Sequence, residues 1–118
     1  MAAVSNMVVG LVAMLHAYFL VLEMFLWDKP IGLKVFNQTF EQARASKVLA
    51  ANQGLYNGFL AAGLVWGLMQ GATGLAIKTF FLGCIVIAGL YGAATASRKI
   101  FFVQAMPALV ALALLWLS

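Results

Sequence analysis

The feature that most constrains this chain is a set of four long apolar stretches that contain almost no charge. Each is close to the ~20 residues that an α-helix needs to cross a hydrocarbon core, and they cover residues 8–27, 48–69, 75–96 and 100–117. Hydrophobic residues make up 65% of the chain and charged residues 8%, with a mean hydropathy of +1.03. Too little polar surface exists to coat a soluble globule. We therefore predict an all-α integral membrane protein, a single domain over residues 1–118 whose four transmembrane helices form an up-down bundle.

The basic residues predict the orientation of this bundle. Cytoplasmic loops hold Lys and Arg in excess. The connection between the first two stretches carries Lys29, Lys34, Arg44 and Lys47, whereas the connection at residues 70–74 carries no basic residue. We expect a multi-pass protein of the cell membrane with both termini on the non-cytoplasmic side. The net charge of +4 then reflects topology and anionic lipid head groups, and gives no reason to propose nucleic acid as a partner.

The first connection also contains helix boundaries. Pro30 ends the first helix, because proline cannot continue the amide ladder and disfavours helical geometry in the residue before it. Thr39 and Gln42 have the spacing of a capping box. We expect the second helix to start there, in the cytoplasm, and to enter the membrane near Lys47.

Glu23 is a carboxylate inside an otherwise nearly apolar stretch, about 6 Å from the inner boundary at ~1.5 Å of rise per residue. An ionisable group at the centre of a bilayer costs roughly 2.5 to 3.5 kcal/mol, so such groups usually face protein or an aqueous cavity. Other polar side chains fall in the same half of the membrane, which predicts a polar chamber open to the cytoplasm. Our candidates for proton transfer are Glu23 and Tyr56. Our candidates for ligand binding are His16, Asn52, Gln53, Asn57, Tyr91, Arg98 and Gln104.

Residue spacing refines this expectation. Asn52 and Tyr56 are four apart, as are Gln53 and Asn57, so each pair shares a side of the second helix. Between these stripes runs a row of small residues that permits close helix approach, and the third stretch has a similar row. The rows are Ala50, Gly54, Gly58 and Ala62 in the second stretch, and Ala88, Gly92 and Ala96 in the third.

Structural interpretations compete with these functional ones. The amides can form interhelical hydrogen bonds that only fix packing. Glu23 can lie near the interface, paired with Lys29 or Lys47. His16 has no second histidine or cysteine at ligand spacing, so no metal site is predicted. The single Cys84 excludes an intrachain disulfide. Sequences of the GxGxxG, Walker, HExxH and GxSxG types do not occur, so nucleotide, zinc-protease and serine-hydrolase chemistry lack support.

Three strings carry a family resemblance: LEMFLW at residues 22–27, GLKVF at 32–36 and VLAANQGLYNGFLAAGLVWG at 48–67. They resemble the small membrane proteins of domain-of-unknown-function family 1304. The resemblance covers nearly the whole chain. It implies a four-span membrane protein and supplies no activity.

A more distant similarity is to the membrane-associated proteins in eicosanoid and glutathione metabolism, which are four-helix trimers. The region 44–57 looks like the part of those proteins that helps to hold glutathione between protomers, although Tyr56 stands where their glutamate would be. This resemblance implies a homo-oligomer, a trimer before a dimer, and glutathione as a candidate ligand.

Three hypotheses remain, in order of preference. The chain is a ligand-binding protein or enzyme acting on a small amphipathic or thiol-containing substrate. Alternatively, it is a small proton-coupled transporter in which Glu23 exchanges protons for a cation. Finally, it is a structural or assembly subunit. Whether it is an enzyme stays open at this point.

Overall fold

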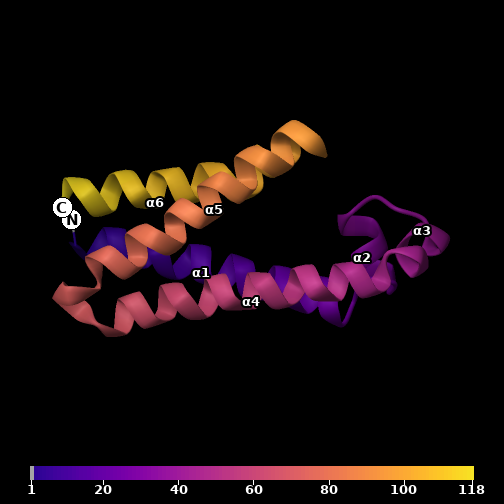
Figure 1. Cartoon of the computed structure of the whole chain (residues 1–118), viewed down its shortest axis with the longest axis horizontal. Coiled ribbons are helices and arrows are strands. Elements are labelled where there is room, and N and C mark those ends of the chain that lie inside the picture. The colour runs from indigo at the N-terminus through magenta and orange to yellow at the C-terminus, as the bar shows by residue number, and fades with distance from the viewer. Residues whose placement is uncertain (1) are drawn as a thin grey trace. The chain divides into compact units, whose positions relative to one another are not determined.

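The structure is a computed structural model that describes residues 2–118, and these residues are helical with no strand (Figure 1). The long helices are α1 (Ala2–Met24), α4 (Lys47–Met69) and α5 (Leu75–Thr95), with α6 (Met106–Leu117) at the end of the chain. The short elements are α2 (Pro30–Val35), α3 (Phe40–Ala45), a 3-10 turn at Gly71–Gly74 and a π-helical turn at Phe101–Ala105. The all-helical prediction is confirmed, and each predicted apolar stretch coincides with helix.

The connection between α1 and α4 folds as its sequence predicts, with one difference. Pro30 opens α2. The capping box of α3 is present, since the Thr39 hydroxyl accepts from the Gln42 amide at 3.1 Å and the Gln42 side chain accepts from the Thr39 amide at 2.9 Å. However, α3 does not run on into α4, because the chain leaves helical geometry at Ser46 (φ −109°, ψ 10°). The Ser46 hydroxyl donates back to the Gln42 carbonyl at 2.9 Å, which ends that turn.

The chain divides into two compact units, each described by itself. One unit, residues 15–59, contains the second half of α1, the short helices and the first half of α4. Its helices approach closely at Gly54 and Gly58. A Cβ on Gly54 would lie 2.6 Å from Met24 Cγ, and one on Gly58 would lie 2.6 Å from Leu20 Cδ1. The predicted small-residue row therefore joins α4 to α1 within this chain.

The other unit, described over residues 2–14 and 60–118, has an apolar core. Helices α1, α4, α5 and α6 all contribute to it, through Val9, Val12, Ala13, Leu64, Leu82, Ile85, Ala108, Ala111 and Leu115. The small-residue row predicted on α5 approaches the last segment at Gly92, where a Cβ would lie 2.9 Å from Ile100 Cγ2. The neighbouring Gly89 approaches more closely, since a Cβ there would lie 2.7 Å from the Ala105 backbone nitrogen. Gly89 thus sets how closely α5 approaches the last helical segment.

The π-helical turn before α6 has a local cause. Pro107 occupies the first turn of α6 and has no amide hydrogen to donate. The amide of Met106, just before it, donates to the Phe101 carbonyl five residues back. This wider turn accommodates the proline ring without ending the helical segment.

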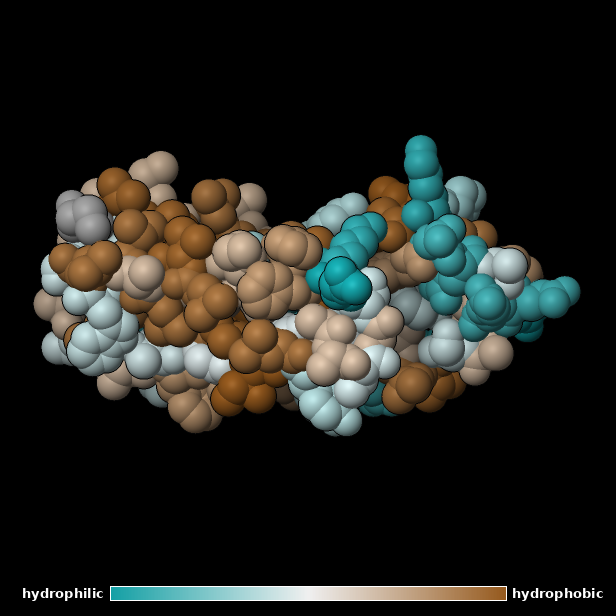
Figure 2. Space-filling view, turned by 90° about the horizontal axis from the view of Figure 1, so that it is seen from above, coloured by the Kyte–Doolittle hydropathy of each residue, from teal (hydrophilic) through white to brown (hydrophobic). Residues whose placement is uncertain are grey.

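Two segments are long and apolar enough to cross a membrane, Ala2–Met24 and Gly71–Thr95, and Phe101–Leu117 is a shorter apolar one. Helix α4 is as long as α1 but is not among them, and its first half carries Asn52, Gln53 and Asn57. Many large apolar side chains are exposed on the helices. Figure 2 shows broad apolar surface over the long helices, whereas hydrophilic atoms gather over α2 and α3. This pattern indicates membrane association.

Candidate functional site

The Glu23 carboxylate meets Asn57 in the unit formed by residues 15–59. The Asn57 side-chain amide donates to Glu23 Oε1 at 2.5 Å, so the bond joins α1 to α4. Gly54, one turn before Asn57, allows the two helices to approach closely enough for this contact. A Cβ on Gly54 would lie only 3.1 Å from Glu23 Cβ. The two side chains touch and are both partly exposed. A ligand would therefore approach the pair from its open side.

Further polar side chains precede Asn57 on α4. Gln53 precedes Asn57 by one turn and is exposed. Tyr56 is 57% exposed, and its ring lies 6.1 Å from that of Phe59. Asn52 is exposed too, and its amide donates to the Val48 carbonyl at 3.1 Å. We call Glu23, Gln53, Tyr56 and Asn57 the polar cluster.

His16 differs from the cluster because it is fully buried. Its ring makes an edge contact with Phe19, at 5.2 Å between centroids. Over residues 2–118 the structure contains no group of three or more His, Cys, Asp or Glu side chains able to hold a metal ion. His16 is thus placed in the packed interior of its unit and away from the exposed face of α4.

The alternative in which Lys47 neutralises Glu23 is not what the structure shows. Lys47 forms an ion pair with Asp28 instead, at 3.0 Å. The hydrogen bond from Lys47 holds the pKa of the Asp28 carboxyl below its usual value. Trp27, beside Asp28, donates its indole N–H to Ser46 Oγ at 3.2 Å and packs on the Phe36 ring at 4.7 Å. These contacts tie the end of α1 to the start of α4 and so fix the helices that carry the polar cluster.

Three predicted ligand-binding residues lie in the other unit. Tyr91 is 72% exposed on α5, and Arg98 is exposed in the connection that follows it. Gln104 is half-buried in the π-helical turn. Because they belong to a different unit from the polar cluster, their part in a common site stays a prediction.

Sequence reasoning missed a second polar pair. Lys78 on α5 is only 6% exposed, and its ammonium donates to Asn6 Oδ1 on α1 at 3.1 Å. Gly67 leaves room for the lysine stem, since a Cβ there would lie 2.6 Å from Lys78 Cγ. The signal in the sequence was a lone lysine at the start of an apolar helix, together with a glycine on the preceding one. It gave no indication that Asn6 would be the partner.

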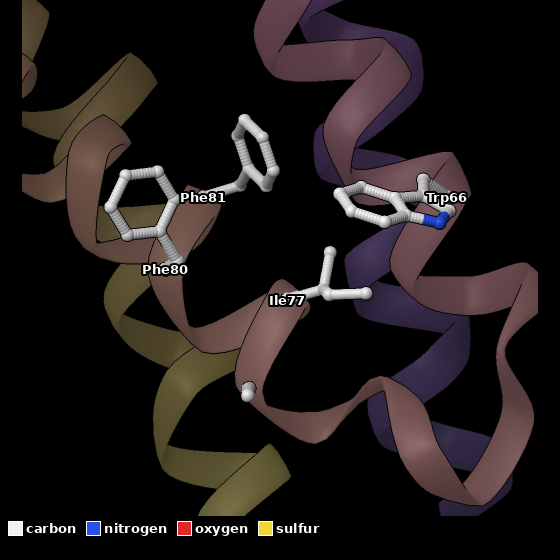
Figure 3. Close-up of a pocket in the computed structure, with 5 residues that line it drawn as sticks. Trp66, Ile77, Phe80 and Phe81 are labelled. Carbon is white, nitrogen blue, oxygen red and sulfur yellow. The ribbon is translucent and has the colours of Figure 1, made fainter.

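The same unit has an apolar cleft of about 320 Å³. Trp66 from α4 faces Ile77 and Phe81 from α5 across it (Figure 3), and the lining is completed by Ala76 and Phe80. Its lining side chains carry no ionisable group. The cleft offers apolar contact and no chemistry.

Comparisons with known proteins agree on one family. The family model described as "Protein of unknown function (DUF1304)" matches residues 10–116. The uncharacterized protein YpaA of Lactococcus lactis subsp. lactis (strain IL1403) is 35% identical over 104 residues, which cover 86% of this chain and 87% of that protein. No solved structure matches the chain. Neither description names an activity.

Proposed function

Because this chain belongs to the DUF1304 family, whose description assigns no activity, we propose a function from its own polar cluster. The protein is a small multi-pass membrane protein that binds the polar end of an amphipathic molecule at Glu23 and Asn57. The observation that carries this proposal is the hydrogen bond between these two side chains, which joins two helices and remains open on one side.

The membrane arrangement is part of the proposal. Helices α1, α4, α5 and α6 each cross the bilayer, with the π-helical turn included in the last span. The exposed apolar side chains support this, because residues such as Met14, Ile87 and Phe102 would otherwise face water. Both termini then lie on the non-cytoplasmic side, since four of the seven basic residues lie in or next to the connection that holds α2 and α3, namely Lys29, Lys34, Arg44 and Lys47.

The polar cluster would meet the head of a molecule that enters from the lipid. Gln53 is exposed one turn before Asn57, on the same side of α4, and so is available for hydrogen bonds. The Glu23 carboxyl and the Tyr56 hydroxyl are the groups of the cluster that can exchange a proton, and we assign to them any proton transfer that accompanies binding. A thiol-containing substrate such as glutathione stays within this proposal only as a candidate.

Assembly as a homo-oligomer, a trimer before a dimer, belongs to the same proposal. Exposed amides such as that of Gln53 are costly against lipid, and a neighbouring copy would cover them. Native mass spectrometry of the detergent-extracted protein measures the assembly. A monomer under all extraction conditions would contradict it.

Retention of small molecules by the purified protein tests the binding function. The protein is extracted from membranes together with Glu23→Gln and, as a matched control, Glu41→Gln, which removes one negative charge from exposed α3. We expect a molecule that the wild type and the control retain and that Glu23→Gln loses about tenfold or more, as for a hydrogen bond to a charged group. An identical set of retained molecules in three folded proteins would show that the pair only fixes the helices.

Proton-coupled transport is the second candidate, because the only ion pair within residues 2–118 is Asp28–Lys47 and Glu23 is left without a cationic partner. A transported cation could fill that position in exchange for a proton. Proton flux into liposomes under a pH gradient separates the two candidates. A binding protein shows no flux that depends on Glu23, whereas a transporter does.

A further inference from the structure

The charge of Glu23 is not balanced inside its unit. The lysine that begins α4 is held by Asp28, and the ion pair between them is the only one in the described part of the chain. Glu23 therefore has a neutral amide, that of Asn57, as its hydrogen-bond partner. A carboxylate in an apolar helix that lacks a counter-ion is costly, and a bound positive charge would remove much of that cost.

The direction of the hydrogen bond determines which ligand groups the pair can still bind. Asn57 uses an N–H to bond Glu23 Oε1, which leaves its own carbonyl oxygen free to accept. The second carboxylate oxygen, Oε2, is also an acceptor. The pair thus presents acceptors, one of them on a carboxyl that a bound cation would hold in its charged form, and so favours a ligand that donates hydrogen bonds and carries positive charge.

A neighbouring side chain suits the same kind of ligand. Gln53, one turn before Asn57 on the same side of α4, is exposed and can accept a hydrogen bond through its side-chain oxygen. A metal ion fits less well, because Ca²⁺ and Mg²⁺ take about six or more oxygen ligands and the cluster has a single carboxylate.

We propose that the molecule bound at the polar cluster is an amphipathic amine, whose ammonium group lies between Glu23 and the side-chain oxygen of Asn57 and whose apolar tail extends into the lipid. This inference rests on the proposed function and narrows its ligand to a chemical class. Head groups that are anionic, such as carboxylates, are rejected by the Glu23 charge.

Three probes with the same twelve-carbon chain test the chemical class of the ligand's head group: dodecylamine, dodecanoate and dodecanol. Equilibrium binding of radiolabelled dodecylamine is measured on the full-length protein in detergent, with the other two as competitors. We expect saturable dodecylamine binding that neither competitor displaces. Glu23→Gln should weaken it about tenfold or more, while Glu41→Gln leaves it unchanged.

A variant that is expected to bind more tightly complements Glu23→Gln, because misfolding can abolish binding but does not tighten it. Gln53→Glu places a second carboxylate one turn from Asn57 at an exposed position, so it should tighten dodecylamine binding severalfold. Glu23-dependent binding of dodecanoate or dodecanol in place of dodecylamine, or weaker amine binding by folded Gln53→Glu, would overturn the amine assignment and leave the site standing. Equal binding of all three probes to wild type and Glu23→Gln would overturn the amine assignment and the proposed site together.

Discussion

The two units of this chain each place an ionisable side chain in an apolar helix, and they treat it differently. In the unit of residues 15–59, Glu23 stays partly exposed, bonds an amide from another helix and has exposed polar neighbours. In the other unit, Lys78 is 6% exposed, its stem passes over Gly67 and its ammonium bonds Asn6. Lys78 is closed off by packing, whereas Glu23 stays partly exposed. An ionisable residue in a membrane helix therefore indicates a site only when its environment leaves it accessible.

Glycines show the same contrast between the two units. Gly89 faces backbone and Cβ atoms of Ala105, which cannot move without shifting the π-helical turn. Gly54 faces mainly the flexible Met24 side chain and the Glu23 Cβ. A methyl group at Gly89 should thus disturb packing, whereas one at Gly54 should disturb the polar cluster.

The largest expected effect is on stability at Gly89. Gly89→Ala puts a Cβ 2.7 Å from the Ala105 nitrogen, so the free energy of unfolding should fall by about 1 to 3 kcal/mol, as for overpacked cores. Unfolding in mixed micelles measures it. The control is Gly83→Ala on the same helix, where a Cβ meets nothing within 4 Å. Equal stability of the two variants would show that α5 does not pack on the last segment as described.

The next effect concerns Lys78 and runs in the opposite direction. If its ammonium serves packing only, Lys78→Met keeps the stem over Gly67 and removes a buried charge, which should raise the free energy of unfolding by about 1 to 2 kcal/mol. Lys78→Ala removes the stem too and should lower it. Thermal unfolding of both variants, with amine binding as a second readout, checks this. Loss of amine binding in Lys78→Met would show that Lys78 does not serve packing alone, and the difference between the two units would not hold.

The sequence was sufficient for the helices and for part of the cluster. Hydropathy located the apolar stretches because each helix buries or exposes apolar side chains along its whole length, and Thr39 with Gln42 located the start of α3 through a local hydrogen-bond pattern. The sequence grouped Glu23 and Asn57 in the same half of the membrane on helices expected to be neighbours, but it did not predict the hydrogen bond between them.

Other features depend on long-range contacts that no local pattern encodes. The break at Ser46 arises where its hydroxyl both donates to Gln42 and accepts from Trp27, nineteen residues earlier in the chain. Lys47 pairs with Asp28, in the connection that follows α1, and not with Glu23, in the last turn of α1. Lys78 and Asn6 are 72 residues apart. Spacing along one helix cannot predict such partners.

A smaller effect on stability, but a clear one on binding, is expected at Gly54. Gly54→Ala should change the free energy of unfolding by less than about 1 kcal/mol, because the Met24 side chain can rearrange. Its Cβ would nevertheless displace Glu23 from Asn57, so dodecylamine binding should weaken about tenfold. Gly10→Ala, with open space at its Cβ, is the control. Unchanged binding in Gly54→Ala would mean that the close approach of α1 and α4 does not position the carboxylate.

The smallest effect is the pH dependence contributed by Asp28. The Lys47 hydrogen bond lowers the Asp28 pKa from its ordinary value of 3.8, so the folded state binds this proton less readily than the unfolded state. The stabilisation by the ion pair is therefore fully present above about pH 3.8 and is lost as the pH falls through the lower folded pKa. Thermal midpoints of wild type and Asp28→Asn should differ slightly at neutral pH and converge in acid. A difference that persists at the lowest pH would assign the effect of Asp28 to packing, and the tie between α1 and α4 would then not depend on charge.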